Sequence, residues 1–148
     1  MKEPIFEEQP DRERELKAVT KFCSLFDLSF EKLDQFNIDF AIKNKRGEVV
    51  SLAEVKGRRY DIFMGDYFIV AMRKVFKLSK EKEPVLIWAC ADGIVFGKVK
   101  DLHGLIQWGG RTTEREGAIN DQELMVYYPR QENLKYAYFH STEYHSLI

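Results

Sequence analysis

The stretch of sequence that decides the fold reads FNIDFAIK at residues 36–43, NKRG at 44–47 and LAEVK at 52–56. Apolar residues alternate with polar or small ones in the first run, which predicts a β-strand with one buried face and with Asp39 on the opposite face. In the last run Glu54 and Lys56 are two residues apart, so they share one face of a second strand, about 6.6 Å apart along it. The sequence therefore predicts two neighbouring strands that carry two carboxylates and a lysine.

The turn between these strands decides whether the polar groups meet. Asn44 and Gly47 are turn formers, and a hairpin loop of even length would place Asp39 opposite Leu52 and diagonal to Glu54. Diagonal neighbours on one face lie about 7–8 Å apart, which is close enough for two carboxylates to bind one cation. A loop of odd length would place Asp39 on the other face, and the sequence permits both.

Two carboxylates in a half-buried site repel each other unless a cation lies between them, and a hard divalent ion with oxygen ligands is the usual solution. A neighbouring lysine suits phosphate chemistry, because a metal polarises the phosphoryl oxygen while the ammonium orients water or stabilises developing negative charge. A structural ion pair between Lys56 and Asp39 is the alternative. The Glu-x-Lys pattern alone carries little weight, since it also occurs at residues 15–17.

The order of these elements resembles the PD-(D/E)xK nucleases, and most closely their small, single-domain phage and resolvase-like members. The resemblance covers residues 10–100 and rests on a helix with Glu, a strand with Asp, a strand with Glu-x-Lys followed by Gly-Arg, and a helix with an inward basic residue. It implies an α/β fold of the restriction-endonuclease-like type, with a mixed sheet flanked by helices. Ile38 stands where the proline of the family's name would be, a position that varies within the family.

The resemblance also implies roles for the residues of the motif. Asp39 and Glu54 would be metal ligands, the carbonyl of Val55 would be a further ligand, and Lys56 would be catalytic. The cofactor would be Mg²⁺ or Mn²⁺ and the reaction hydrolysis of DNA phosphodiester bonds, in recombination, repair or phage DNA processing. A catalytically inactive nuclease fold that binds DNA or protein is the alternative, and a purely structural α/β protein is a third interpretation.

Two further residues are candidates for the same site. The helix expected at residues 12–28 has Glu15 one turn before Val19 of its apolar stripe, and a glutamate on this helix often completes the metal site in the family. Lys74 falls within an apolar stripe of a second expected helix, where family members often carry a basic residue that enters the active site. The alternatives are a charged residue at the fringe of the first helix and a lysine that extends from the stripe to solvent.

Basic residues near the motif are candidates for contact with a DNA backbone. They form one cluster at the expected turn and one directly after Glu-x-Lys: Lys43, Lys45, Arg46, Arg58 and Arg59. The alternative is a solvated surface of mixed sign, which agrees with a net charge of −1.

The remaining expectations concern the whole chain. Its 148 residues, with 45% hydrophobic and 32% charged residues, suit one domain with a single core, residues 1–148. Two isolated cysteines argue against zinc and for a reducing compartment, and no apolar run has membrane-spanning length, so we expect a cytoplasmic protein without membrane contact. A homodimer is a candidate assembly through the aromatic C-terminal segment, which contains Tyr127, Tyr128, Tyr136, Tyr138 and Phe139.

Secondary structure outside the motif is expected from the same patterns. Residues 62–82 predict a loop and then a helix that starts near Gly65, and residues 108–121 predict a loop. Two strands joined by Asp92-Gly93 are predicted at 84–91 and 94–100, because Asp-Gly is a strong hairpin signal. Residues 124–128 predict a further strand, and residues 134–139 a strand or a short helix.

Overall fold

The computed structural model describes residues 9–33, 40–78, 83–111 and 121–148. In chain order, the elements are α1 (Gln9–Phe26), β1 (Ser29–Lys32), β2 (Phe40–Lys43), β3 (Val49–Gly57), β4 (Tyr67–Ala71), α2 (Met72–Leu78), β5 (Val85–Ala89), β6 (Gly93–Lys98), a 3-10 turn η1 (Val99–Asp101), β7 (Leu105–Arg111), β8 (Asp121–Pro129), β9 (Lys135–Tyr138) and β10 (His145–Ser146).

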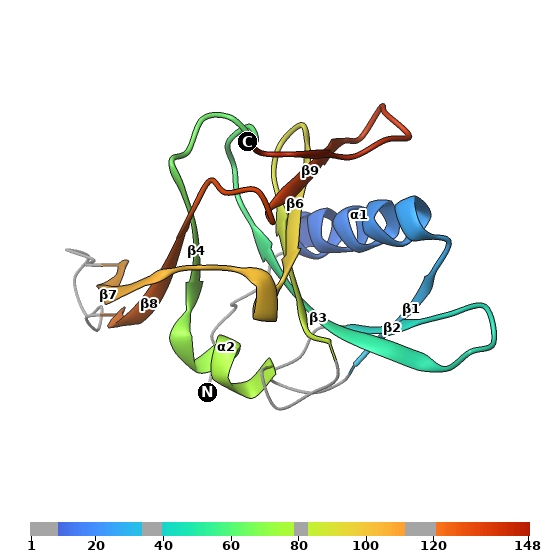
Figure 1. Ribbon diagram of the computed structural model, residues 1–148, viewed down its shortest axis with the longest axis horizontal. Helices are drawn as coiled ribbons and strands as arrows, with labels where there is room; N and C mark the ends of the chain where they lie inside the picture. The colour runs from blue at the N-terminus through green and yellow to red at the C-terminus, as the bar shows by residue number, and fades with distance from the viewer. Residues whose placement is uncertain (1–8, 34–39, 79–82, 112–120) are drawn as a thin grey trace.

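The described strands form two sheets (Figure 1). The larger sheet has seven strands in the order β1-β2-β3-β5-β6-β9-β10, and it is mixed because β3 and β5 run parallel while the other neighbours run antiparallel. The smaller sheet has the order β4-β8-β7 and is antiparallel. This is the mixed α/β architecture that the sequence predicted.

The larger sheet is covered on both faces. Helix α1 packs its apolar stripe, including Val19 and Phe22, against one face, where Val55 and Ile87 point. The smaller sheet and α2 cover the opposite face, and a second apolar cluster there is centred on Trp88. Because β5 lies between these layers, all five of its residues are buried, which explains why its sequence VLIWA lacks polar alternation.

The hairpin of β2 and β3 differs from the expected register by two residues. The expected pairing would set Phe40 opposite Ser51, whereas Phe40 pairs with Ala53, and the register shifts between Ile42 and Lys43. Lys43 pairs with Val49, so the loop consists of residues 44–48 and has an odd length, and the amide of Asn44 donates a hydrogen bond to the carbonyl of Glu48 within it. The odd loop accounts for one residue of the difference, and the irregularity between Ile42 and Lys43 accounts for the other. From Phe40 to Ile42 the shift by two positions preserves the expected alternation, so Leu52 keeps its expected face, whereas Val50, at the irregularity, packs against the cluster beneath α1 and not on the face of Leu52 as expected.

Residues 67–71 are a strand, so the prediction of a helix from Gly65 onward was wrong for them. The sequence YFIVA is aromatic and β-branched, and Phe68 and Val70 point into the interior while Ile69 faces the other way. Within the described part of this segment, the helix is Met72–Leu78, and residues 79–82 of the predicted helix lie outside the described residues. A strand that pairs with distant β8 is a long-range contact, which local periodicity does not reveal.

The other predictions are mostly confirmed. The helix predicted at 12–28 is α1, and the strands predicted on either side of Asp92-Gly93 are the antiparallel pair β5 and β6. The strand predicted at 124–128 is part of β8. Of the two alternatives for residues 134–139, the structure has the strand, β9. The prediction of a loop at 108–121 was wrong at its ends, since Trp108 lies in β7 and Asp121 begins β8, and residues 112–120 lie outside the described residues. Among the described residues, we find no helix with the length and apolar character required to cross a membrane.

Both cysteines are buried, and this gives a first test of the fold. Burial raises the pKa of Cys23 to about 11 and that of Cys90 to about 12, so both thiols stay protonated at neutral pH. We therefore expect no rapidly reacting thiol in native protein treated with Ellman's reagent at pH 8, and two equivalents after unfolding in guanidinium chloride. Rapid reaction of either thiol in the native protein would contradict the packing.

Candidate functional site

Glu54 is a buried carboxylate in the middle of the molecule. It lies in β3, where its side chain is only 2% exposed, and its Cα partner on β5 is Leu86. Leu86 belongs to the apolar cluster under the smaller sheet, so Glu54 points into the space between the larger sheet and α2. A carboxylate in such a place is costly unless a positive group accompanies it.

Lys74 of α2 supplies that positive group. Its Nζ lies 3.3 Å from Oε1 of Glu54, and its side chain is 14% exposed. The lysine therefore points inward to the predicted site and does not extend to solvent from the rim of the helix. Helix α2 follows β4 without a linker, so the position of this strand determines where Lys74 lies.

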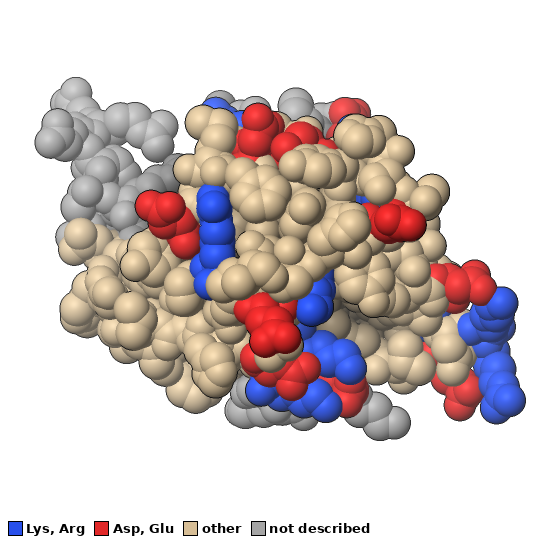
Figure 2. All heavy atoms as spheres, turned by 45° about the horizontal axis from the view of Figure 1, so that its top comes forward, with Lys and Arg blue, Asp and Glu red and all other residues tan. Residues whose placement is uncertain are grey.

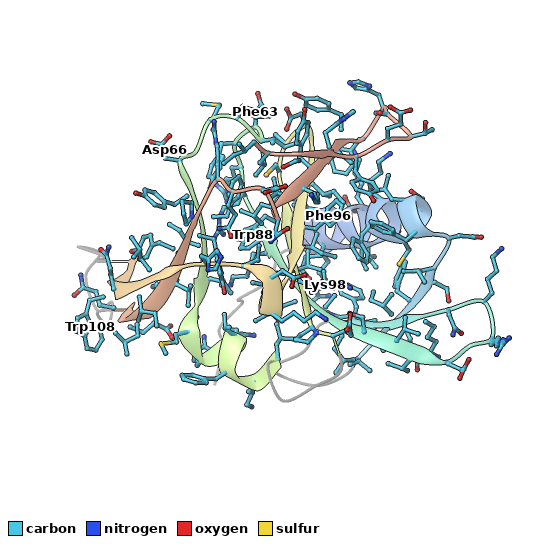
Figure 3. The ribbon with its side chains drawn as sticks, viewed as in Figure 1. Phe63, Asp66, Trp88, Phe96, Lys98 and Trp108 are labelled. Atoms are coloured by element: carbon cyan, nitrogen blue, oxygen red, sulfur yellow. The ribbon has the colours of Figure 1, made fainter. Side chains whose placement is uncertain are left out.

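The carbonyl of Ile69 fixes β4 to the larger sheet. It accepts a hydrogen bond of 3.0 Å from Nε1 of Trp88 in β5 and a second one from Nη2 of Arg58, which directly follows β3. Figure 3 shows Trp88 at the centre of the molecule, between the two sheets. Sequence reasoning missed this anchor, although a buried tryptophan needs a partner for its N–H group and so gave a signal.

Lys56 and Val55 occupy the two faces of β3. Lys56 is half-buried, shares the face of Glu54 as predicted, and is the Cα partner of Trp88. Val55 has its side chain in the core beneath α1, at 2% exposure, so only its backbone can take part in the site. Among the described strands, β2 pairs with β3 only as far as Ala53, and β5 alone accompanies residues 54–57.

Of the predicted metal ligands Asp39 and Glu15, the structure describes only Glu15. Asp39 lies outside the described residues, directly before Phe40 in the chain. Glu15 is half-buried and lines a hollow with Lys32 and Phe40, on the α1 side of the sheet. The first turns of α1 reach the carboxyl end of β3, because a Cβ atom added to Gly57 would lie 3.3 Å from Nη1 of Arg14.

A metal site made of three clustered acidic, histidine or cysteine side chains is not present within the described part of the chain. Glu54 is nevertheless a suitable ligand, because its carboxylate is a hard oxygen donor held in the interior. The ammonium of Lys74 lies against this carboxylate, 3.3 Å from Oε1.

The basic turn lies away from this site. Lys43 pairs with Glu31 and Lys45 with Asp27 at 2.6 Å. Hydrogen bonding to Asp27 raises the pKa of Lys45, and hydrogen bonding from Lys43 lowers the pKa of Glu31. The turn joins β3 at Val49, which is five residues before Glu54 and therefore roughly 16 Å from it at about 3.3 Å per residue.

The remaining basic candidates differ in how far they are exposed to solvent. Arg46 and Arg59 are exposed, whereas the guanidinium group of Arg58 is engaged with the carbonyls of Gly57 and Ile69. Arg58 therefore has a structural contact that its position in the sequence did not indicate. Figure 2 shows acidic and basic groups side by side on one face of the molecule, in agreement with the small net charge.

The architecture and the site together define the class. A mixed sheet with α1 on one face, and with Glu54, Lys56 and Lys74 gathered on the other, is the restriction-endonuclease-like fold. The chain belongs to the family described as "phage putative PDDEXK endonuclease", whose sequence model matches residues 1–135. No curated protein and no solved structure matches the chain.

The buried pair gives a prediction about stability. Lys74→Met removes the ammonium that lies 3.3 Å from Oε1 of buried Glu54, so we expect a loss on the order of 3 kcal/mol in the free energy of unfolding. Glu54→Gln removes the opposite charge and should also destabilise. The double variant should lose less than the sum of the two, by about 1–3 kcal/mol.

Urea denaturation of the four proteins measures this coupling. Each variant should keep the slope of the transition, so that a change in midpoint reports stability. Strictly additive losses would contradict an energetic interaction between Glu54 and Lys74.

Proposed function

We propose that this protein is a divalent-metal-dependent nuclease that hydrolyses phosphodiester bonds in DNA. The observation that carries the proposal is the pairing of buried Glu54 with Lys74, beside Lys56 on the same face, in a chain of this nuclease family. Metal binding, catalysis and the DNA substrate are all part of the proposal.

The ligands proposed for Mg²⁺ or Mn²⁺ are the carboxylates of Asp39 and Glu54 and the carbonyl of Val55. Phe40 pairs with Ala53, so Asp39 and Glu54 are the next residues along the chain from a described pair. All three are oxygen donors, which these ions prefer over nitrogen or sulfur. Glu15 is a second-rank candidate, because it lines a hollow next to Phe40.

The bound cation would polarise the phosphoryl oxygen and make water a better nucleophile. Lys56 orients the attacking water and stabilises negative charge that develops on the phosphate, and because the residue is half-buried, solvent screens this interaction less than it would on an open surface. Lys74 holds the Glu54 carboxylate in place by its ion pair, and its ammonium is close enough to bind the scissile phosphate beside that carboxylate. The apolar surroundings of Trp88 keep bulk water from the inner side of this pair.

For the basic residues, we propose contacts with the phosphate backbone by Arg59, Arg46, Lys43 and Lys45. The exposed ion pairs of the two lysines contribute little and open readily to another anion. Arg58 is the weakest of the candidates, because its guanidinium group already binds backbone carbonyls.

Loss of a metal ligand tests the mechanism. Asp39→Ala and Glu54→Gln should each lower the rate of DNA cleavage about 10³-fold or more, because a missing ligand removes several kcal/mol of transition-state stabilisation. Lys56→Ala should also be severely impaired. The measurement is a panel of single strands, duplex ends, flaps and four-way junctions with Mg²⁺ or Mn²⁺.

Glu48→Ala is the matched control, because Glu48 is an exposed carboxylate on the hairpin turn and should leave the rate unchanged. Far-UV circular dichroism verifies that each variant is folded. Cleavage by Asp39→Ala at the wild-type rate would refute the mechanism. Binding of DNA by the wild-type protein without cleavage of any substrate would favour a nuclease-like binding module.

A further inference from the structure

Large aromatic side chains lie exposed on the outer side of α2. Phe76 of α2 is 58% exposed and Trp108 of β7 is 70% exposed. Both line one open hollow of about 500 Å³, together with Met72, Arg73, Glu123 and Leu124. In Figure 3, Trp108 projects from β7 away from the body of the molecule. Exposed aromatic groups that line a common hollow mark a binding surface.

The charge of this surface suits a polyanion. Helix α2 reads MRKVFKL, with three basic residues and no acidic one. Lys74 turns inward to Glu54, whereas Arg73, Phe76 and Lys77 are exposed. Arg73 pairs with Glu123 at 2.9 Å, and with side chains 62% and 38% exposed this pair is screened by water. The Arg73 guanidinium group can therefore exchange its partner for a phosphate at little cost.

The helix also links this hollow to the proposed nuclease centre. Lys74 and Phe76 are two residues apart, on the inner and outer sides of α2. An α-helix with its side chains is about 10–12 Å across, so a strand that passes around α2 from Glu54 reaches the hollow within a few nucleotides. A base that stacks there would hold the strand on one side of the cleaved bond.

From this arrangement, we propose that the hollow between Phe76 and Trp108 binds an unpaired nucleobase of the DNA substrate, with Arg73 and Lys77 on the adjacent phosphates. Aromatic side chains stack on bases of any sequence, but only an unpaired base offers a free face. The inference rests on the proposed function for the identity of the ligand. It narrows the substrate class to DNA with a single-stranded segment.

Tryptophan fluorescence tests the proposal directly. The chain has two tryptophans, and Trp88 is fully buried whereas Trp108 is exposed. The titration uses wild-type protein in EDTA, so that no DNA is cut, with oligothymidylate as one probe and a blunt hairpin duplex of equal nucleotide number as the other. We expect oligothymidylate to quench the wild-type emission and the duplex to quench it much less. Trp108→Phe, which reports on Trp88 alone, should show no quenching.

A second measurement is the affinity of the protein for labelled oligothymidylate, determined by fluorescence anisotropy. Trp108→Ala should weaken binding about tenfold or more, whereas Trp108→Phe keeps an aromatic face and should stay within about threefold of wild type. Equal quenching by both probes, no binding of oligothymidylate, or unchanged affinity of Trp108→Ala would each overturn the proposal. A blue shift of emission with rising protein concentration in the absence of DNA would instead identify this surface as a contact between two copies of the chain.

The outcome is separable from that of the cleavage assay, because binding is measured without divalent metal. Quenching without any metal-dependent cleavage would support the proposed stacking site and contradict the proposed nuclease activity. Cleavage without quenching would support the proposed nuclease activity and contradict the proposed stacking site.

Discussion

The ion pair between Glu54 and Lys74 is the constraint on which the rest of the structure depends. A carboxylate at 2% exposure requires a cation, and the cation comes from a helix that belongs to a different layer of the molecule. Helix α2 must therefore be held at a fixed distance from β3. Strand β4 does this, because the carbonyl of Ile69 accepts bonds from Trp88 and Arg58 of the larger sheet.

One face of the larger sheet forms an apolar core, and the other carries the polar residues of the candidate site. The face under α1 is apolar and carries Val55 and Ile87, so it supplies stability. The opposite face carries Glu54 and Lys56 within a second apolar cluster, and there the polar groups lie in a place with little solvent screening. Period-two alternation from Leu52 to Lys56 of β3 produces this division.

Sequence reasoning succeeded where local alternation decides the answer and failed where distant contacts do. The common face of Glu54 and Lys56 follows from their spacing alone, and it survives the two-residue shift of the hairpin. The strand at Tyr67–Ala71 was missed because its partner β8 is far away in the chain: Ala71 pairs with Met125, 54 positions on, and Tyr67 with Pro129, 62 positions on. The inward direction of Lys74 was one of two open alternatives, since it depends on how β4 is anchored. The role of Asp39 rests on the family pattern, because this residue lies outside the described part of the chain.

The most direct test of the central claim is calorimetric titration with Mn²⁺ in the absence of DNA. If Glu54 is a metal ligand, wild-type protein should show saturable binding, Glu54→Gln should lose it, and Glu48→Gln, which changes an exposed carboxylate on the hairpin turn, should retain it. No saturable heat with wild-type protein, or equal binding by wild type and Glu54→Gln, would contradict the assignment of this buried carboxylate to a metal centre.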